Sequence, residues 1–218
     1  MLLFPNWTRI SHVLAVHGVR VDAEVLASAE PHAKYILDGH SESGTLNDRQ
    51  RGWRYFNLIL ERAGIPLSEQ TDAALAQLHE HHAAHNLWEL VPGDVVPALK
   101  RLRGLGLKLV VISNANGTLH AVFDRLGLTP HLDAAFDSFH EGVEKPDPRL
   151  FQIALERVGA RKETTIHVGD IYHVDVVGAR NAGLRPVLLD PSGLYEGYDC
   201  PRVRSLSDLG DGLEKGVF

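Results

Sequence analysis

Three sets of polar residues in this chain could together handle a phosphoryl group. Ser113 and Asn114 follow an apolar run, and a hydroxyl beside turn amides suits phosphate oxygens. Lys145, followed directly by proline, offers a fixed positive charge that would offset the charge on phosphate. Asp170 and Asp175 offer the hard oxygen ligands that Mg²⁺ takes. The set predicts phosphate binding by Ser113, Asn114 and Lys145, catalytic roles for Ser113 and Lys145, and metal binding by the two aspartates.

Each of these residues also has a simpler interpretation when taken alone. Ser and Asn are common turn formers after a strand, and Lys145 could be an exposed loop residue. Asp170 could cap a helix, and Asp175 could complement the dipole of that helix. The order of the whole set along the chain is what favours a shared site.

A parallel sheet would bring these residues together. Short β-branched apolar runs bounded by Gly, Pro or polar residues predict strands at residues 107–112, 135–139, 165–168 and 186–189. A helix capped by Asp94 is expected before the first of these strands, further helices begin near Gly117 and Pro148, and a last one is expected near 206–214. The carboxyl ends of parallel strands converge on one crevice, where the polar residues would meet. The C-terminal part is therefore predicted to be α/β, doubly wound and mainly parallel.

The N-terminal part of the chain has a helical pattern without strand-like alternation. Gly18 and Gly64 stand where helices would end, and Ser68 could cap the last helix. Four helices are expected, at 7–17, 22–37, 46–63 and 68–85. We therefore predict two domains, a smaller all-helical one at 1–88 and a Rossmann-like one at 89–218.

The composition describes an ordinary globular protein. The 218 residues are 44% hydrophobic and carry a formal net charge of −6, with no run of four Lys or Arg, which argues against nucleic acid as a partner. Cys200 is the single cysteine and cannot form an internal disulfide. Because no long apolar stretch or secretory leader is present, no membrane association is expected and a reducing cytoplasm is the predicted location. The oligomeric state stays open.

The combined motifs resemble the haloacid dehalogenase superfamily. Residues 110–114 look like its second motif, 145–148 like its third and 167–175 like its fourth, with 178–183 extending the match. The resemblance covers essentially the whole chain. It implies a Rossmann-like core, a helical cap formed by residues 1–88, and a hydrolase, most simply a Mg²⁺-dependent phosphatase of a small phosphorylated metabolite.

The same resemblance implies a nucleophile that the quoted motifs lack. In the family an aspartate of the first motif, Asp-x-Asp-x-Thr, attacks phosphorus to form an aspartyl-phosphate. Residues 2–5 look like the sequence directly after that motif, so the nucleophile is expected upstream of Met1 and the 218-residue chain itself is expected to be inactive. The motif's strand is central in the family, so without it the edges of the two neighbouring strands would lack a partner.

Alternative readings remain open at this point. A 2-haloacid dehalogenase would need no metal, and a non-catalytic phosphate or metal binder would need no nucleophile. The histidines of 79–85 are either a metal site or a solvated helix face. Trp53, Tyr55 and the segment 39–44 either contact substrate or belong to the core and to a turn. The substrate itself cannot be read from the sequence.

Overall fold

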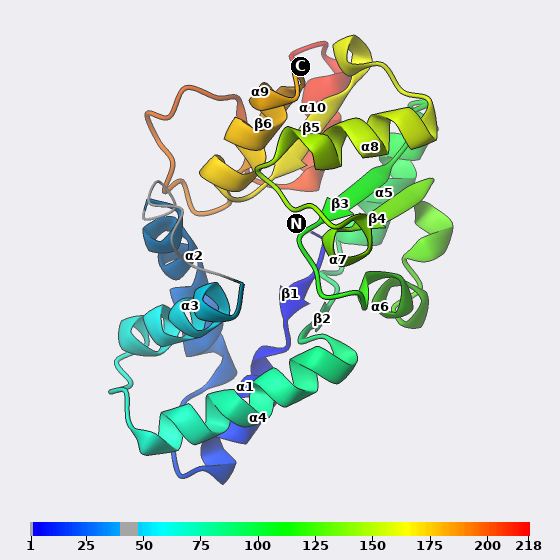
Figure 1. The fold of residues 1–218 in the computed structure, drawn as a ribbon. Coiled ribbons are helices and arrows are strands. Elements are labelled where there is room, and N and C mark those ends of the chain that lie inside the picture. Colours follow the sequence, from blue (N-terminus) through cyan, green and yellow to red (C-terminus); the bar gives the residue numbers. More distant parts are fainter. Residues whose placement is uncertain (1, 40–47) are drawn as a thin grey trace. The chain divides into compact units, whose positions relative to one another are not determined.

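A computed structural model describes residues 2–39 and 48–218, which form two units (Figure 1). Residues 5–88 make up the helical unit, and residues 2–4 with 89–218 make up the α/β unit. The chain passes between the units at two short strands that pair with each other, β1 (Phe4–Pro5) and β2 (Trp88–Leu90). Most of the segment 39–44, considered above for substrate contact, lies outside the described residues.

Four helices form the helical unit, as the sequence pattern predicts: α1 (Trp7–Val16), α2 (Ala23–Gly39), α3 (Asp48–Arg62) and α4 (Glu69–His85). Ser68 and Thr71 form a reciprocal capping box at the start of α4, which satisfies amides that the first turn leaves without partners. Apolar residues spaced along each helix close one core, whose most buried members include Ile10, Leu14, Leu26, Ala33, Ile59 and Ala74.

Tyr55 belongs to the core of the helical unit. Its side chain is 6% exposed, and its hydroxyl donates a hydrogen bond to Oε1 of Glu30 at 2.7 Å. Lys34 pairs with the same oxygen at 2.8 Å, which compensates the buried carboxylate. Of the two interpretations that the sequence left open for Tyr55, this position favours membership of the core.

The strands of the α/β unit form two parallel sheets. One contains β3 (Val110–Ser113) and β4 (Ala134–Asp137), and the other has the order β5 (Ile166–Gly169), β6 (Arg185–Leu189), β7 (Arg202–Val203). β3 ends one residue later than predicted. β4 ends two residues earlier than predicted because Asp137 caps a short helix, α7 (Ser138–Glu141). Within the described residues, β3 and β5 each stand at the edge of their sheet.

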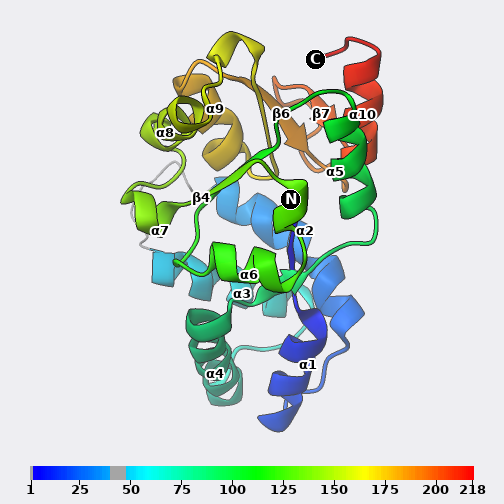
Figure 2. The same cartoon turned by 90° about the vertical axis from the view of Figure 1, so that its right-hand side faces the viewer.

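Helices cover both faces of the strands, as Figure 2 shows. On one face α5 (Val95–Gly104) and α10 (Leu206–Glu214) place Leu102 and Leu209 against β6 and β7. On the other, α8 (Pro148–Val158) and α9 (Gly178–Asn181) bury Phe151 and Ala179. The remaining elements are α6 (Leu119–Arg125), the one-turn helices η2 (Thr129–His131) and η3 (Lys162–Thr164), and the π-helical turn η4 (Tyr172–Val177). This is the doubly wound α/β architecture that the sequence predicts.

Two details differ from the sequence interpretation or limit it. Asp94 stands at the start of α5 but makes no capping hydrogen bond, because its backbone is already helical there. In the part of the chain that the structure describes, no helix is long and apolar enough to cross a membrane.

Candidate active site

The predicted site residues meet beyond the carboxyl ends of β3 and β5. Ser113 is the last residue of β3, and Asp170 directly follows β5. The Nζ atom of Lys145 lies 2.7 Å from Oδ1 of Asp175. The fold thus brings a hydroxyl, an ammonium and two carboxylates to the edge of the strands where open α/β sheets bind ligands.

Asn114 holds the backbone of Lys145. Its Nδ2 donates to the Lys145 carbonyl, and its Oδ1 accepts from the Lys145 amide, both at 2.8 Å. Two antiparallel bonds to one residue fix the segment that carries the lysine. Asn114 was predicted to bind phosphate. In the structure its side-chain amide instead bonds to the backbone of Lys145, and so positions the residue that carries the positive charge.

The carboxylate of Asp175 is the centre of the site. Its Oδ1 accepts hydrogen bonds from Lys145 and from Nε2 of His167 at 3.1 Å, and its Oδ2 accepts from the backbone amides of Asp170 and Ile171 at 3.0 and 3.1 Å. The residue is only 3% exposed. Burial alone would raise the pKa of Asp175, but the Lys145 ammonium and the bonds from His167 and Lys145 outweigh it and hold the pKa well below its ordinary value.

Gly169 makes the approach of Asp175 possible. A Cβ atom added to Gly169 would lie 2.1 Å from Cγ of Asp175, far inside van der Waals contact. The turn after β5 can therefore fold over the carboxylate only because this position has no side chain. The motif Gly169-Asp170 is thus explained by packing as well as by chemistry.

His167 is a member of the site that reasoning from single residues missed. It lies in β5, with its side chain 12% exposed, and its ring packs edge-on against Phe151 with centroids 4.9 Å apart. Burial lowers the pKa of His167, and the hydrogen bond to Asp175 opposes that shift only in part. The ring is therefore neutral, with its N–H on Nε2, where it can donate to the carboxylate. A polar residue in a predicted buried strand was the one available indication.

Asp137 and Ser138 support the loop after β3 and were also missed. The Asp137 carboxylate is 1% exposed, and it accepts from the backbone amides of Gly117, Leu119 and Phe139 at 3.0 to 3.2 Å. The Ser138 hydroxyl accepts from the amide of residue 115 at 3.1 Å. These bonds fix the turn that follows Ser113 and Asn114. The sequence hid them because both residues fell inside the strand expected at 135–139.

The residues present fit a metal ion only in part. Among the described residues, no group of three or more His, Cys, Asp or Glu side chains gathers around a point that could hold a metal. Both oxygens of Asp175 already accept two hydrogen bonds each, so direct ligation would require one donor to leave. Asp170 stands next to this carboxylate, and Mg²⁺ needs only one or two protein carboxylates when water and phosphate complete its shell.

The helical unit contains the other features that the sequence singled out. The rings of His81 and His85 have centroids 5.2 Å apart, while Nδ1 of His82 accepts from the Leu87 amide and so caps the end of α4. Burial lowers the pKa of His82.

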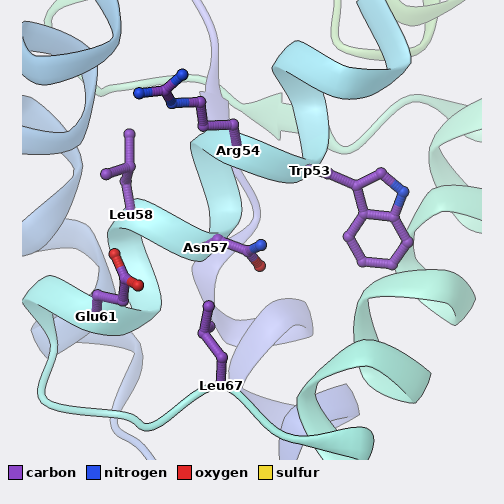
Figure 3. Close-up of a pocket in the computed structure, with 6 residues that line it drawn as sticks. All are labelled: Trp53, Arg54, Asn57, Leu58, Glu61 and Leu67. Carbon is purple, nitrogen blue, oxygen red and sulfur yellow. The ribbon is translucent and has the colours of Figure 1, made fainter.

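A pocket of about 470 Å³ on α3 and the turn after it is lined by Trp53, Arg54, Asn57, Leu58, Glu61 and Leu67 (Figure 3). Among the described residues, Oδ1 of Asn57 is one of the buried side-chain atoms without a hydrogen-bond partner.

Known proteins resemble this chain in sequence and in fold. A family model for haloacid dehalogenase-like hydrolases matches residues 12–183. Haloacid dehalogenase-like hydrolase domain-containing protein 3 of Mus musculus is 35% identical over 178 residues, covering 79% of this chain and 70% of the relative. The ribulose-1,5-bisphosphate 5-phosphatase of Halopiger xanaduensis is 36% identical over 171 residues, covering 75% and 70%.

A solved structure extends the likeness to the whole fold. The HAD-hydrolase YfnB from Bacillus subtilis, bound to magnesium, gives a TM-score of 0.66 at 17% identity and covers 97% of this chain and 94% of that one. At that level of identity the likeness concerns the fold alone. With the family model and the relatives, it places this chain among the haloacid dehalogenase-like hydrolases, an α/β Rossmann-like core with a helical cap.

Proposed function

We propose that this protein is a Mg²⁺-dependent phosphatase of a small phosphorylated metabolite. The observation that carries the proposal is the Lys145 ammonium, held 2.7 Å from Asp175 at the carboxyl ends of β3 and β5. An ammonium group has three N–H donors, so the bond to Asp175 leaves it the capacity to bind phosphate oxygens as well. A relative named as a phosphatase of a sugar bisphosphate supports a small phosphorylated sugar or similar metabolite as the substrate class. A cytoplasmic location, without nucleic-acid partners, is part of the same proposal.

Each residue of the site receives a role in this proposal. Lys145 offsets the negative charge that develops on the phosphoryl group, and Ser113 donates its hydroxyl to a phosphate oxygen. Asn114 places Lys145, and the turn beside it adds backbone amides. Asp170 is the metal ligand we favour, with Asp175 either completing the metal site or holding Lys145. When bound, Mg²⁺ would neutralise charge on the phosphate group.

The proposed reaction proceeds through an aspartyl-phosphate whose nucleophile would stand at the end of a strand between β3 and β5. The edge positions of β3 and β5 in their separate sheets support this part of the proposal, because such a strand would find a partner on either side. A parallel strand entering there would end beside Lys145 and Asp170, where an attacking carboxylate is needed.

The test begins with the protein purified from its native source. Its intact mass is compared with the 24.0 kDa of this chain, and phosphate release from phosphorylated sugars is measured with Mg²⁺ and with EDTA. We expect hydrolysis that requires Mg²⁺ and falls at least 100-fold in Lys145→Met, because a charge-stabilising donor is worth about that factor. Arg149→Met, which removes an exposed cation of the neighbouring helix, should leave the rate unchanged.

Other outcomes of the same assay identify the competing functions. Phosphate binding without hydrolysis would identify a non-catalytic binder. Halide release from a 2-haloacid without any metal would identify a dehalogenase. Either result would overturn the proposed phosphatase.

A further inference from the structure

We propose that His167 is a positioning residue that acts through Asp175 to fix the ammonium group of Lys145. The inference rests on the proposed function in one respect, since it takes Lys145 as the group that meets phosphate. It concerns the contact between His167 and Asp175, to which the family membership by itself assigns no role.

Four side chains form one continuous line of contacts behind the site. The Phe151 ring packs edge-on against His167 with centroids 4.9 Å apart, and Nε2 of His167 lies 3.1 Å from Oδ1 of Asp175. The same oxygen lies 2.7 Å from Nζ of Lys145. Because the imidazole and the ammonium share one acceptor atom, a shift of that atom moves both contacts.

His167 is placed to do this by the geometry of β5. Side chains two residues apart project from the same face of a strand, so His167 and Gly169 share a face. Gly169 leaves the space into which Asp175 packs, and His167 closes the side of that space with an N–H donor. The ring itself packs edge-on against Phe151, from α8, and this contact restrains it from following the carboxylate.

The donor from His167 completes the fixation of the carboxylate. The amides of Asp170 and Ile171 hold Oδ2. With these two bonds alone, the carboxylate could still rotate about Oδ2. A second directed bond on Oδ1 removes the pivot and gives Lys145 a fixed acceptor. A lysine side chain has four rotatable bonds, so its ammonium is localised only as well as the group that it meets. Removal of the His167 donor should therefore disorder the Lys145 ammonium while the protein stays folded.

Two substitutions at His167 test whether the donor matters. His167→Gln retains an N–H at nearly the position of Nε2, and His167→Leu fills the space without a donor. Val168→Ala is the matched control, because Val168 lies on the opposite face of the same strand and packs into another apolar cluster. If His167→Leu does not fold, His167→Asn replaces it, since its shorter amide cannot reach Asp175.

The first readout is the NMR signal of the Lys145 ammonium, assigned through its loss in Lys145→Met. We expect a slowly exchanging resonance in the unsubstituted protein, retention in His167→Gln and in Val168→Ala, and loss in His167→Leu. A resonance that survives in His167→Leu, or that is absent from the unsubstituted protein, would overturn the proposal. So would an equal loss in Val168→Ala, because that would indicate a general loosening of the strand.

The second readout is the dissociation constant for inorganic phosphate, measured by calorimetry. We expect about a tenfold weakening in His167→Leu and less than a threefold change in His167→Gln, in line with the loss of one bond to a charged group. Equal affinity in all three proteins would overturn the proposal. If the unsubstituted protein binds no phosphate, the proposed function fails, and the ammonium resonance alone still decides the role of His167.

Discussion

At the scale of single residues, the site is organised around one buried carboxylate. Asp175 accepts a bond from each of two side chains and two backbone amides, and these donors come from two parts of the chain, Lys145 and the stretch from β5 to Ile171. A buried charge of this kind is tolerated because its partners compensate the loss of water. The carboxylate therefore contributes to stability and to placement of Lys145 at the same time.

The charge of Asp175 should make folding pH-dependent. Because its folded-state pKa lies below the ordinary value of 3.8, the carboxylate adds stability above that pH and loses the contribution as the pH falls below it. We expect Asp175→Asn to lower the free energy of unfolding at pH 7 by about 3–5 kcal/mol. Urea unfolding at pH 7 and near pH 3 measures this.

The difference in unfolding free energy between the unsubstituted protein and Asp175→Asn should be smaller near pH 3 than at pH 7. Asp199→Asn is the control, because its exposed carboxylate should contribute little at either pH. A constant difference between pH 7 and pH 3 would contradict the assignment of the low pKa to Asp175.

Gly169 offers a second prediction at this scale. We expect Gly169→Ala to displace Asp175, weaken phosphate binding at least tenfold and lower the melting temperature, because the new methyl group overlaps the carboxylate. Gly104→Ala in α5 has open space around its Cβ and should be neutral or stabilising by about 0.5–1 kcal/mol. Calorimetric titration and thermal unfolding of both variants measure the contrast. Unchanged phosphate affinity in Gly169→Ala would mean that Asp175 tolerates the shift.

At the scale of elements, the end of β4 determines the shape of the loop after β3. The two strands are parallel neighbours in register from Val110 to Ser113, so the turn that leaves β3 lies beside Asp137. The carboxylate there accepts from the amide of Gly117 in this loop and from the amides of Leu119 and Phe139 in the first turns of α6 and α7, which would otherwise lack an acceptor. One side chain thus fixes a loop that sequence pattern describes only as a turn.

Removal of the Asp137 carboxylate should destabilise this loop. We expect Asp137→Ala to cost about 2–4 kcal/mol of unfolding free energy, since buried amides lose a charged acceptor. Asp94→Ala is the control, because Asp94 stands at the start of a helix without a capping bond and should change stability by less than about 0.5 kcal/mol. Denaturant unfolding compares the two. If the two variants lost equal unfolding free energy, the hydrogen bonds of Asp137 would make no measurable contribution to stability, which would contradict the prediction.

At the scale of the whole molecule, the two units have separate cores. The helical unit closes its own apolar cluster, and Tyr55 with Glu30 and Lys34 forms a polar network inside it. The α/β unit holds all of the residues proposed for phosphate chemistry. Changes inside one core should therefore have effects that can be distinguished from changes in the other.

Tyr55→Phe tests this separation. We expect it to lower the free energy of unfolding by about 1.5–3 kcal/mol, because the buried Glu30 loses a donor, and to leave phosphate affinity unchanged. Thermal unfolding and calorimetric titration of the same preparation measure both quantities. A loss of phosphate affinity that exceeds threefold would instead support the substrate contact considered from the sequence.

The sequence alone determined the classes of element and singled out the residues that are proposed for the site. Helical periodicity located α1 to α4 within a few residues, and the β-branched runs located β3 and β5, because these patterns are local and repeat over many residues. Ser113, Lys145 and Asp170 could be singled out because strand ends and proline-flanked positions have a signature in the chain itself.

Tertiary structure decided what the site residues do to one another. That Lys145 and His167 meet at one oxygen of Asp175, and that Asn114 holds the backbone of Lys145, depend on contacts between residues at least eight positions apart in the sequence. The strand boundary at Asp137 was misplaced for the same reason, since its partners are amides of a distant loop. A residue's type states which bonds it can make, and only packing selects the partners with which it makes them.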